Sequence, residues 1–215
     1  MRVPAGQTAA GGSSASDAQT VGTLGPRAFW LALAGLILCG LLTRVVILRE
    51  FLEANPLSRL LYSDPAEYWD WAARIAQGEL IQDKPFLSAP LYPYLLGLLR
   101  ALGGSLTTVY IAQLVAHLLT AVGLAWIGRL RFGPTAGLLA ATLFLLLTEP
   151  AFDAPRLLPT TLQLALLCAL WLALLRAGKR ASLRRCALAG ALLGLNCLAN
   201  RPMILAIPLL SLIHI

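Results

Sequence analysis

The sequence predicts an all-α polytopic membrane protein, and three observations lead to this fold class. Of its 215 residues, 58% are hydrophobic and 13% are charged, whereas a soluble domain has about 45–50% apolar and about 25% charged residues. The apolar residues gather into runs long enough to form membrane-spanning helices. The acidic residues concentrate in one segment and the basic residues in short loops, as expected when charge follows membrane topology.

The chain begins with a polar tail that leads into a long apolar run. Residues 1–27 are rich in Gly, Ala, Ser and Thr and are expected to be a flexible cytoplasmic tail, because they cannot bury enough apolar surface to fold. Residues 28–48 have the length and composition of a first transmembrane helix. Arg44 lies near its end and is expected to extend its charge to the membrane surface.

Residues 49–105 differ in composition from the rest of the chain. They hold seven of the ten acidic residues and eight of the sixteen aromatic residues. Trp and Tyr together with mixed charge are typical of the membrane–water interface. We therefore expect a first extracytoplasmic loop that contains short amphipathic helices lying on the bilayer.

Further apolar runs predict the remaining helices. Helices two to five are expected at residues 106–128, 134–148, 158–176 and 186–199, and residues 202–215 are expected to begin a sixth. Residues 149–157 would form an outer loop and residues 177–185 a basic cytoplasmic loop. Because the sequence stops inside an apolar run, we expect it to be a fragment of a longer protein.

Basic residues in the short loops predict the orientation. The segment 128–134 carries Arg129 and Arg131, and residues 176–185 carry five basic residues; neither contains an acid. The positive-inside rule then places both segments and the N-terminus in the cytoplasm. Topology therefore accounts for the net charge of +7, and nucleic-acid binding is not expected. The predicted location is a bacterial inner membrane or plasma membrane.

The stretch from Tyr62 to Trp71 can be interpreted in two compatible ways. As a helix start, Ser63 or Asp64 would cap the helix, Pro65 would occupy its first position and Glu67 would complete a capping box. As a catalytic segment, it would present a carboxylate that takes a proton from an acceptor hydroxyl or amine. A cap would fix the direction in which that carboxylate points.

A proline-rich segment follows this stretch. Pro85, Pro90 and Pro93 lie within nine residues, and proline interrupts a helix interior. We therefore expect no regular helix before Pro93. The segment would form a surface turn with interfacial tyrosines or a rigid wall beside a substrate groove.

Several motifs, in this order along the chain, resemble those of GT-C glycosyltransferases. More narrowly, they are similar to the family that includes aminoarabinose transferases of lipid A and relatives of protein O-mannosyltransferases. The similarity covers Phe29 to Leu210, about the N-terminal half of a typical member. The motifs that carry it are Asp64-x-x-x-Tyr68, Ala72-Ala73-x-Ile75-Ala76-x-Gly78, Ala89-Pro90-Leu91-Tyr92-Pro93-Tyr94, the turn Arg129–Gly137, Leu157–Thr161 and Asn200-Arg201-Pro202.

The resemblance implies a GT-C-like transmembrane helix bundle with a definite chemistry. Such enzymes move a sugar from a polyprenyl-phosphate donor in the lipid bilayer to an extracytoplasmic glycan, lipid or protein acceptor, and no cofactor is implied. Asp64 is the expected catalytic base. The family often has a second acid directly after this aspartate, where the present chain has Pro65. Glu67 and Asp70 are the nearest substitutes.

Other residues are candidates for substrate contact. Tyr68 and Tyr92 belong to the motifs above, and Asp153, near Glu149, lies where the family often has an acid. Arg156 and Arg201 fall on the predicted outer side, against the positive-inside trend. They would either anchor helices at the interface or pair with a lipid phosphate through charge-assisted hydrogen bonds.

Some polar residues lie within the apolar runs. Tyr110, Gln113 and His117 share one helical face and are expected to hydrogen-bond to a neighbouring helix. The four cysteines are each set in apolar sequence without metal-ligand spacing, and no metal site is expected. The sequence has no glycine-rich phosphate loop, which argues against a nucleotide-sugar donor.

Two other functional classes stay open. A transporter or flippase would place ionisable residues near mid-membrane and would contain broken helices in paired positions. A non-catalytic membrane subunit would use the outer loop to bind a partner, and it would tolerate Asp64→Asn while changes at Trp69 or Trp71 disturbed it.

Overall fold

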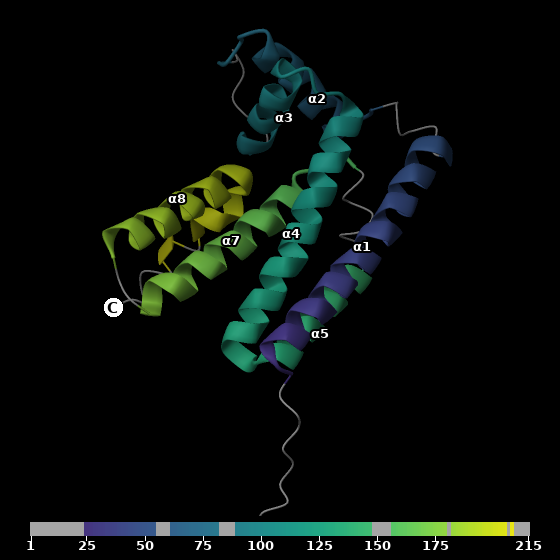
Figure 1. Cartoon of the computed structure of the whole chain (residues 1–215). Helices are drawn as coiled ribbons and strands as arrows, with labels where there is room; N and C mark the ends of the chain where they lie inside the picture. The colour runs from purple at the N-terminus through teal and green to yellow at the C-terminus, as the bar shows by residue number, and fades with distance from the viewer. Residues whose placement is uncertain are drawn as a thin grey trace, which may run out of the picture.

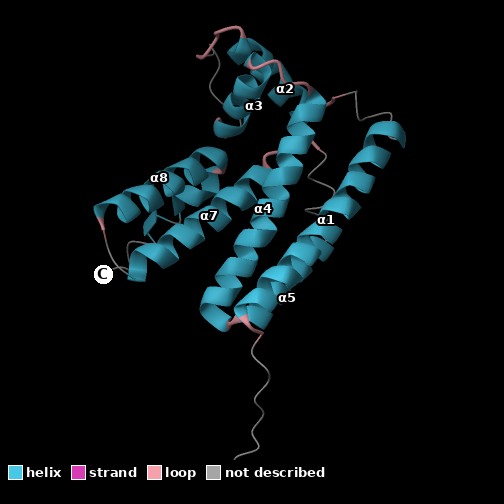
Figure 2. Ribbon diagram, viewed as in Figure 1, coloured by secondary structure: helices cyan, strands magenta, loops and turns pink. Residues whose placement is uncertain are grey.

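The computed structural model describes residues 24–54, 61–81, 89–147, 156–179, 182–205 and 207–208. Within these residues every regular element is a helix and no strand occurs (Figure 2). The predicted all-α class is therefore confirmed. The helices form a bundle, and two short helices lie across one of its ends (Figure 1).

Three helices of the described chain are long and apolar enough to cross a membrane. They are α1 (Pro26–Ala54), α4 (Leu106–Phe132) and α7 (Thr160–Lys179). At 1.5 Å per residue, even the shortest of them reaches about 30 Å, which is the thickness of the hydrocarbon core. Since these helices expose many large apolar side chains that only lipid would solvate well, the chain is an integral membrane protein.

Two further helices pack as hairpins on these spans. Helix α5 (Pro134–Leu146) turns back along α4 after Gly133, whose φ of 98° suits glycine. The two helices approach closely, because a Cβ atom on Gly137 would lie 2.3 Å from the carbonyl oxygen of Ala125. Helix α8 (Leu183–Ala199) pairs with α7 in the same way and is followed by the 3-10 helix Arg201–Leu205.

The side chain of Arg44 does not reach the membrane surface, contrary to the prediction. It is 5% exposed and points into the bundle, where it donates a 2.5 Å hydrogen bond to the carbonyl of Leu145. Its other contact is Nε2 of His117, at 3.4 Å. The physical reason is the shortness of α5, whose last carbonyls lack helical partners and are within reach of the guanidinium.

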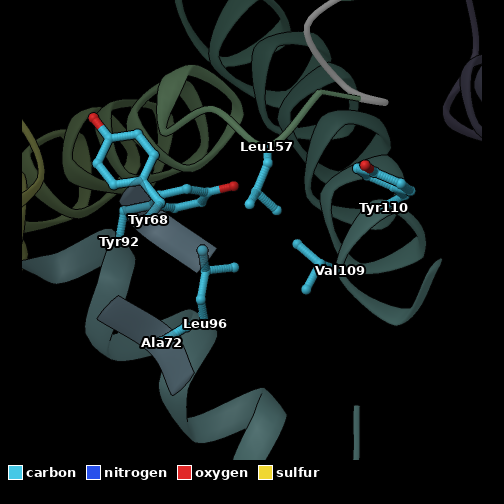
Figure 3. Packing of buried hydrophobic residues seen from close by; sticks show 7 residues of the cluster. All are labelled: Tyr68, Ala72, Tyr92, Leu96, Val109, Tyr110 and Leu157. Atoms are coloured by element: carbon cyan, nitrogen blue, oxygen red, sulfur yellow. The ribbon is translucent and has the colours of Figure 1, made fainter. Parts of the chain in front are cut away.

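The end of the bundle is covered by α2 (Asp64–Ala76) and α3 (Leu91–Ala101). These helices lie where short amphipathic helices were expected, and they meet the start of α4 (Figure 1). The guanidinium of Arg100 lies 4.5 Å above the ring of Trp69 and links the two helices. Their shared core is an aromatic and aliphatic cluster (Figure 3): Tyr68, Ala72, Tyr92, Leu96, Val109, Tyr110 and Leu157.

The termini of α2 show which capping signals determine its ends. The predicted stop at Gly78 is confirmed: this residue has a φ of 98°, and the amides of Gly78 and Glu79 bond back to Ile75 and Arg74 in a Schellman motif. The predicted capping box is wrong. Helix α2 begins at Asp64 itself, and no side chain bonds to its free backbone amides.

The expectation that proline would exclude a helix before Pro93 is also wrong. Helix α3 begins at Leu91, so Pro93 is its third residue. The first four amides of a helix have no partner within it, and proline at this position therefore removes no hydrogen bond. Pro93 is buried at the junction of the helix with the bundle.

Candidate active site

A cavity of about 330 Å³ opens at the end of the bundle, beneath the start of α2. This volume lies at the lower end of the range of about 300–1,000 Å³ that is common for small-ligand pockets. Four parts of the chain form its walls: the end of α1, the start of α2, the start of α4 and the segment before α7. The lining residues are Phe51, Leu61, Tyr62, Ser63, Asp64, Pro65, Tyr110, Arg156, Leu157 and Leu158.

Asp64 is the acidic group among the residues that line this cavity. It is the first residue of α2, and the hydroxyl of Ser63 lies 3.4 Å from its Oδ1. Ser63 has a φ of 57° and a ψ of −138°, a conformation that costs a non-glycine residue about 1–3 kcal/mol. This strained residue sets the direction in which the chain enters α2. It thereby sets the position of the Asp64 backbone that carries the carboxylate.

Arg156 contributes a positive charge to the same cavity. It lies in an irregular stretch before α7, where its backbone carbonyl accepts hydrogen bonds from Nε2 of Gln113 at 2.8 Å and from the amide of Leu158 at 2.9 Å. The fold thereby brings together two sequence-predicted residues that are far apart along the chain. A carboxylate and a guanidinium in one cavity can serve as a base and as an anion-binding group.

Aromatic residues also line the cavity. Phe51 at the end of α1 and Tyr110 on α4 meet edge to face, with ring centroids 5.7 Å apart. Phe51 could not be predicted from the sequence, because one aromatic residue at a helix end carries no signal of a binding site. For Tyr110, the sequence predicts only a place on the polar face of α4.

The structure keeps the other predicted residues of α2 and α3 away from this cavity. Glu67 and Asp70 are exposed on α2 and are not among the lining residues. Tyr68 and Tyr92 are buried in the core behind it, with ring centroids 5.3 Å apart (Figure 3). Burial raises the pKa of Tyr92, and the nearby Tyr110 and Tyr68 add to this effect, so its hydroxyl stays protonated and donates a hydrogen bond.

The remaining candidates lie elsewhere. Arg201 begins the 3-10 helix after α8, is exposed and does not line the cavity. Asp153 and Glu149 fall outside the described residues. In the part of the chain that the structure describes, no group of three or more His, Cys, Asp or Glu side chains could hold a metal ion.

The polar face of α4 makes the interhelical bonds that its sequence predicts. Gln113 accepts a 3.1 Å hydrogen bond from the hydroxyl of Tyr92 on α3, and His117 lies 3.4 Å from Arg44 on α1. The ring of His117 also stacks on Phe144 of α5, at a centroid distance of 4.6 Å. This face therefore joins the transmembrane bundle to the helices that cover its end.

Comparison with known protein families identifies the chain. The family described as dolichyl-phosphate-mannose-protein mannosyltransferase matches residues 83–214, which is more than half of the sequence. The chain belongs to this family. It is therefore a membrane glycosyltransferase of the GT-C type, as its motifs predicted. No curated protein and no solved structure matches it.

The matched region holds only part of the cavity. Arg156 and the Gln113 that supports it lie inside the mannosyltransferase match, whereas Asp64 precedes it. Family membership shows a glycosyltransferase but assigns no role to Arg156. The role of Asp64 depends on the geometry of the cavity and on the motif resemblance.

Proposed function

We propose that this chain transfers a sugar from a polyprenyl-phosphate carrier to an acceptor on the extracytoplasmic side of the membrane. The observation that carries the proposal is the placement of Asp64 and Arg156 in one cavity at the end of an apolar bundle. A lipid-linked donor could keep its chain in the bilayer while its phosphate and sugar enter this cavity. Mannose, which the family description names, is the first sugar to test.

The proposed reaction is a direct displacement at the anomeric carbon. The acceptor oxygen or nitrogen forms a bond to this carbon while the bond to the phosphate oxygen breaks, which inverts the configuration. Asp64 takes the proton that the acceptor loses. The polyprenyl phosphate leaves as an anion, and Arg156 stabilises its charge through charge-assisted hydrogen bonds.

Asp64→Asn tests the role of the base. Purified protein or membranes would receive labelled polyprenyl-phosphate mannose together with peptide, glycan or lipid acceptors, and sugar transfer would be followed. We expect the variant to lose about 10²–10⁴-fold in kcat, the usual contribution of a general base, with little change in KM. Glu67→Gln is the matched control, because Glu67 lies on the same helix, is exposed and does not line the cavity.

Equal activity of wild-type protein and Asp64→Asn would reject Asp64 as the base. Arg156→Met should instead raise the KM for the donor, because it removes the charge proposed to bind phosphate. Should the wild type bind no polyprenyl phosphate at all, the donor assignment itself would fail.

A further inference from the structure

The amide of Gln113 connects three parts of the molecule that meet at the cavity. This residue lies on α4, is 6% exposed and makes three hydrogen bonds. Its Oε1 accepts from the Tyr92 hydroxyl at 3.1 Å. Its Nε2 donates to the carbonyls of Arg156 at 2.8 Å and Leu158 at 3.3 Å. Both ends of the amide are thereby used.

The segment that Gln113 holds forms one wall of the cavity. Residues 156–158 precede α7 and belong to no helix, so no helical hydrogen-bond ladder fixes them. All three residues nevertheless line the cavity, and Leu157 between the two bonded carbonyls is 1% exposed. The Gln113 bonds and the 2.9 Å bond from the Leu158 amide to the Arg156 carbonyl fix the backbone from which the Arg156 side chain extends.

The two backbone carbonyls determine which way the amide faces, and Tyr92 completes its hydrogen bonds. An asparagine or glutamine amide can present its oxygen or its nitrogen to a given neighbour. Because the carbonyls of Arg156 and Leu158 can only accept, Nε2 of Gln113 must face them, which leaves Oε1 for the Tyr92 hydroxyl on α3. Tyr92 belongs to the buried core (Figure 3), so this orientation is tied to the packing of α3 on the bundle.

We propose that Gln113 is a positioning residue that fixes residues 156–158, the part of the cavity wall that carries Arg156, with Tyr92 as the partner that holds its Oε1. The inference rests on the proposed function where it concerns the donor, since Arg156 is there the group that binds phosphate. In its structural part it stands on the three hydrogen bonds alone. Gln113 itself touches no substrate.

The decisive variant is Gln113→Glu. A glutamate has nearly the same shape and still accepts the bond from Tyr92, but an ionised carboxylate cannot donate to the carbonyls of Arg156 and Leu158, and a protonated carboxyl can donate to only one of them. The proposal predicts faster hydrogen–deuterium exchange of the peptide that contains residues 156–158. With at least one hydrogen bond lost, it also predicts a roughly tenfold rise in the KM for the polyprenyl-phosphate donor, with a much smaller change in kcat.

Gln163→Glu provides a matched control. Gln163 also uses its Nε2 to bond a distant carbonyl, that of Ala199 at 2.8 Å, and it ties α7 to α8 away from the cavity. The same substitution there should leave both the exchange of residues 156–158 and the KM unchanged. If the two variants raise exchange and KM alike, the effect is a general loosening of the bundle and the proposal is overturned.

Tyr92→Phe serves as a second variant that introduces no charge. It removes the hydrogen bond to Oε1 of Gln113 but keeps the ring in the core, so we expect the same changes with a smaller size, about threefold in KM. Normal exchange of residues 156–158 in both variants would contradict the positioning role. Raised exchange in a protein whose wild type binds no polyprenyl phosphate would retain the positioning role and reject the proposed donor, so the two failures are distinguishable.

Discussion

Ser63 adopts a backbone conformation that its side chain opposes. Its φ of 57° with a ψ of −138° lies in a region that is essentially reserved for glycine. No side-chain capping bond compensates for the strain. Strain held beside a candidate base suggests that the geometry of the cavity was retained at a cost to stability.

Ser63→Gly should therefore stabilise the protein. Glycine adopts this conformation without the steric penalty, and we expect a gain of about 1 kcal/mol in the free energy of unfolding, less than the full strain because glycine also has more freedom when unfolded. Thermal unfolding in detergent micelles would measure it. Ser63→Ala is the control, since it removes the hydroxyl and keeps the strain; a similar gain in both variants would contradict the argument.

At the residue scale, sequence identifies chemical groups better than it identifies their geometry. Asp64 and Arg156 were both selected from the sequence, but only the tertiary fold could place them in one cavity. Asp64 and Glu67 have the spacing of a capping box, yet α2 already begins at Asp64, so Asp64 is the first helical residue and not the cap. Local patterns cannot include such a constraint, because other elements impose it.

At the scale of elements, the C-terminal end of α5 depends on a side chain of helix α1 for a hydrogen-bond donor. It has 13 residues, or about 20 Å, and this is short for a bilayer core of about 30 Å. Its terminal carbonyls would otherwise be unpaired in an apolar medium, where each costs several kcal/mol. Arg44 of α1 donates to one of them, that of Leu145.

Arg44→Lys should lower the free energy of unfolding by about 1–3 kcal/mol, because a shorter ammonium cannot reach the buried carbonyl with the geometry of a guanidinium. Arg49→Lys is the matched control on the same helix. Arg49 pairs with Glu53 at 2.8 Å on the exposed surface, and its change should stay within about 0.5 kcal/mol. Equal unfolding midpoints for the two variants would show that the Arg44 bond contributes nothing to stability.

The contact between α4 and α5 depends on small residues. Gly137→Ala would place a methyl group against the Ala125 carbonyl, which is backbone and cannot rotate away, so we expect a loss near the upper end of about 1–3 kcal/mol. Gly190→Ala on α8 meets no atom within 4 Å and should gain up to about 1 kcal/mol from better helix propensity. If the unfolding midpoints of Gly137→Ala and Gly190→Ala moved in the same direction, the argument from close helix contact would be contradicted.

The sequence indicates that helices form in the apolar runs, but it indicates much less clearly at which residues they begin and end. Apolar runs of about 20 residues can satisfy their backbone in lipid only as helices, so the spans follow from composition. The start of α3 before Pro93 was missed, because proline is harmless in a first turn and the sequence does not mark where that turn begins. The burial of Arg44 was missed because its partner carbonyl on α5 is distant in sequence.

On the scale of the whole molecule, charge and geometry indicate one orientation. The acidic start of α2 and the cavity lie at one end of the bundle, and the α4–α5 turn, with Arg129 and Arg131 just before it, lies at the other (Figure 1). Short basic segments face the cytoplasm. The cavity would then open to the outside, where a lipid-linked sugar and its acceptor would meet.

Single cysteines would test this orientation in intact cells. After replacement of the four native cysteines, Glu79→Cys beyond α2 should react with a membrane-impermeant maleimide, because this exposed position belongs to the cavity end. Ser182→Cys, exposed before α8 in the basic segment, should react only after the membrane is permeabilised. The reverse pattern would place the cavity on the cytoplasmic side, and the acceptor would then have to be a cytoplasmic molecule.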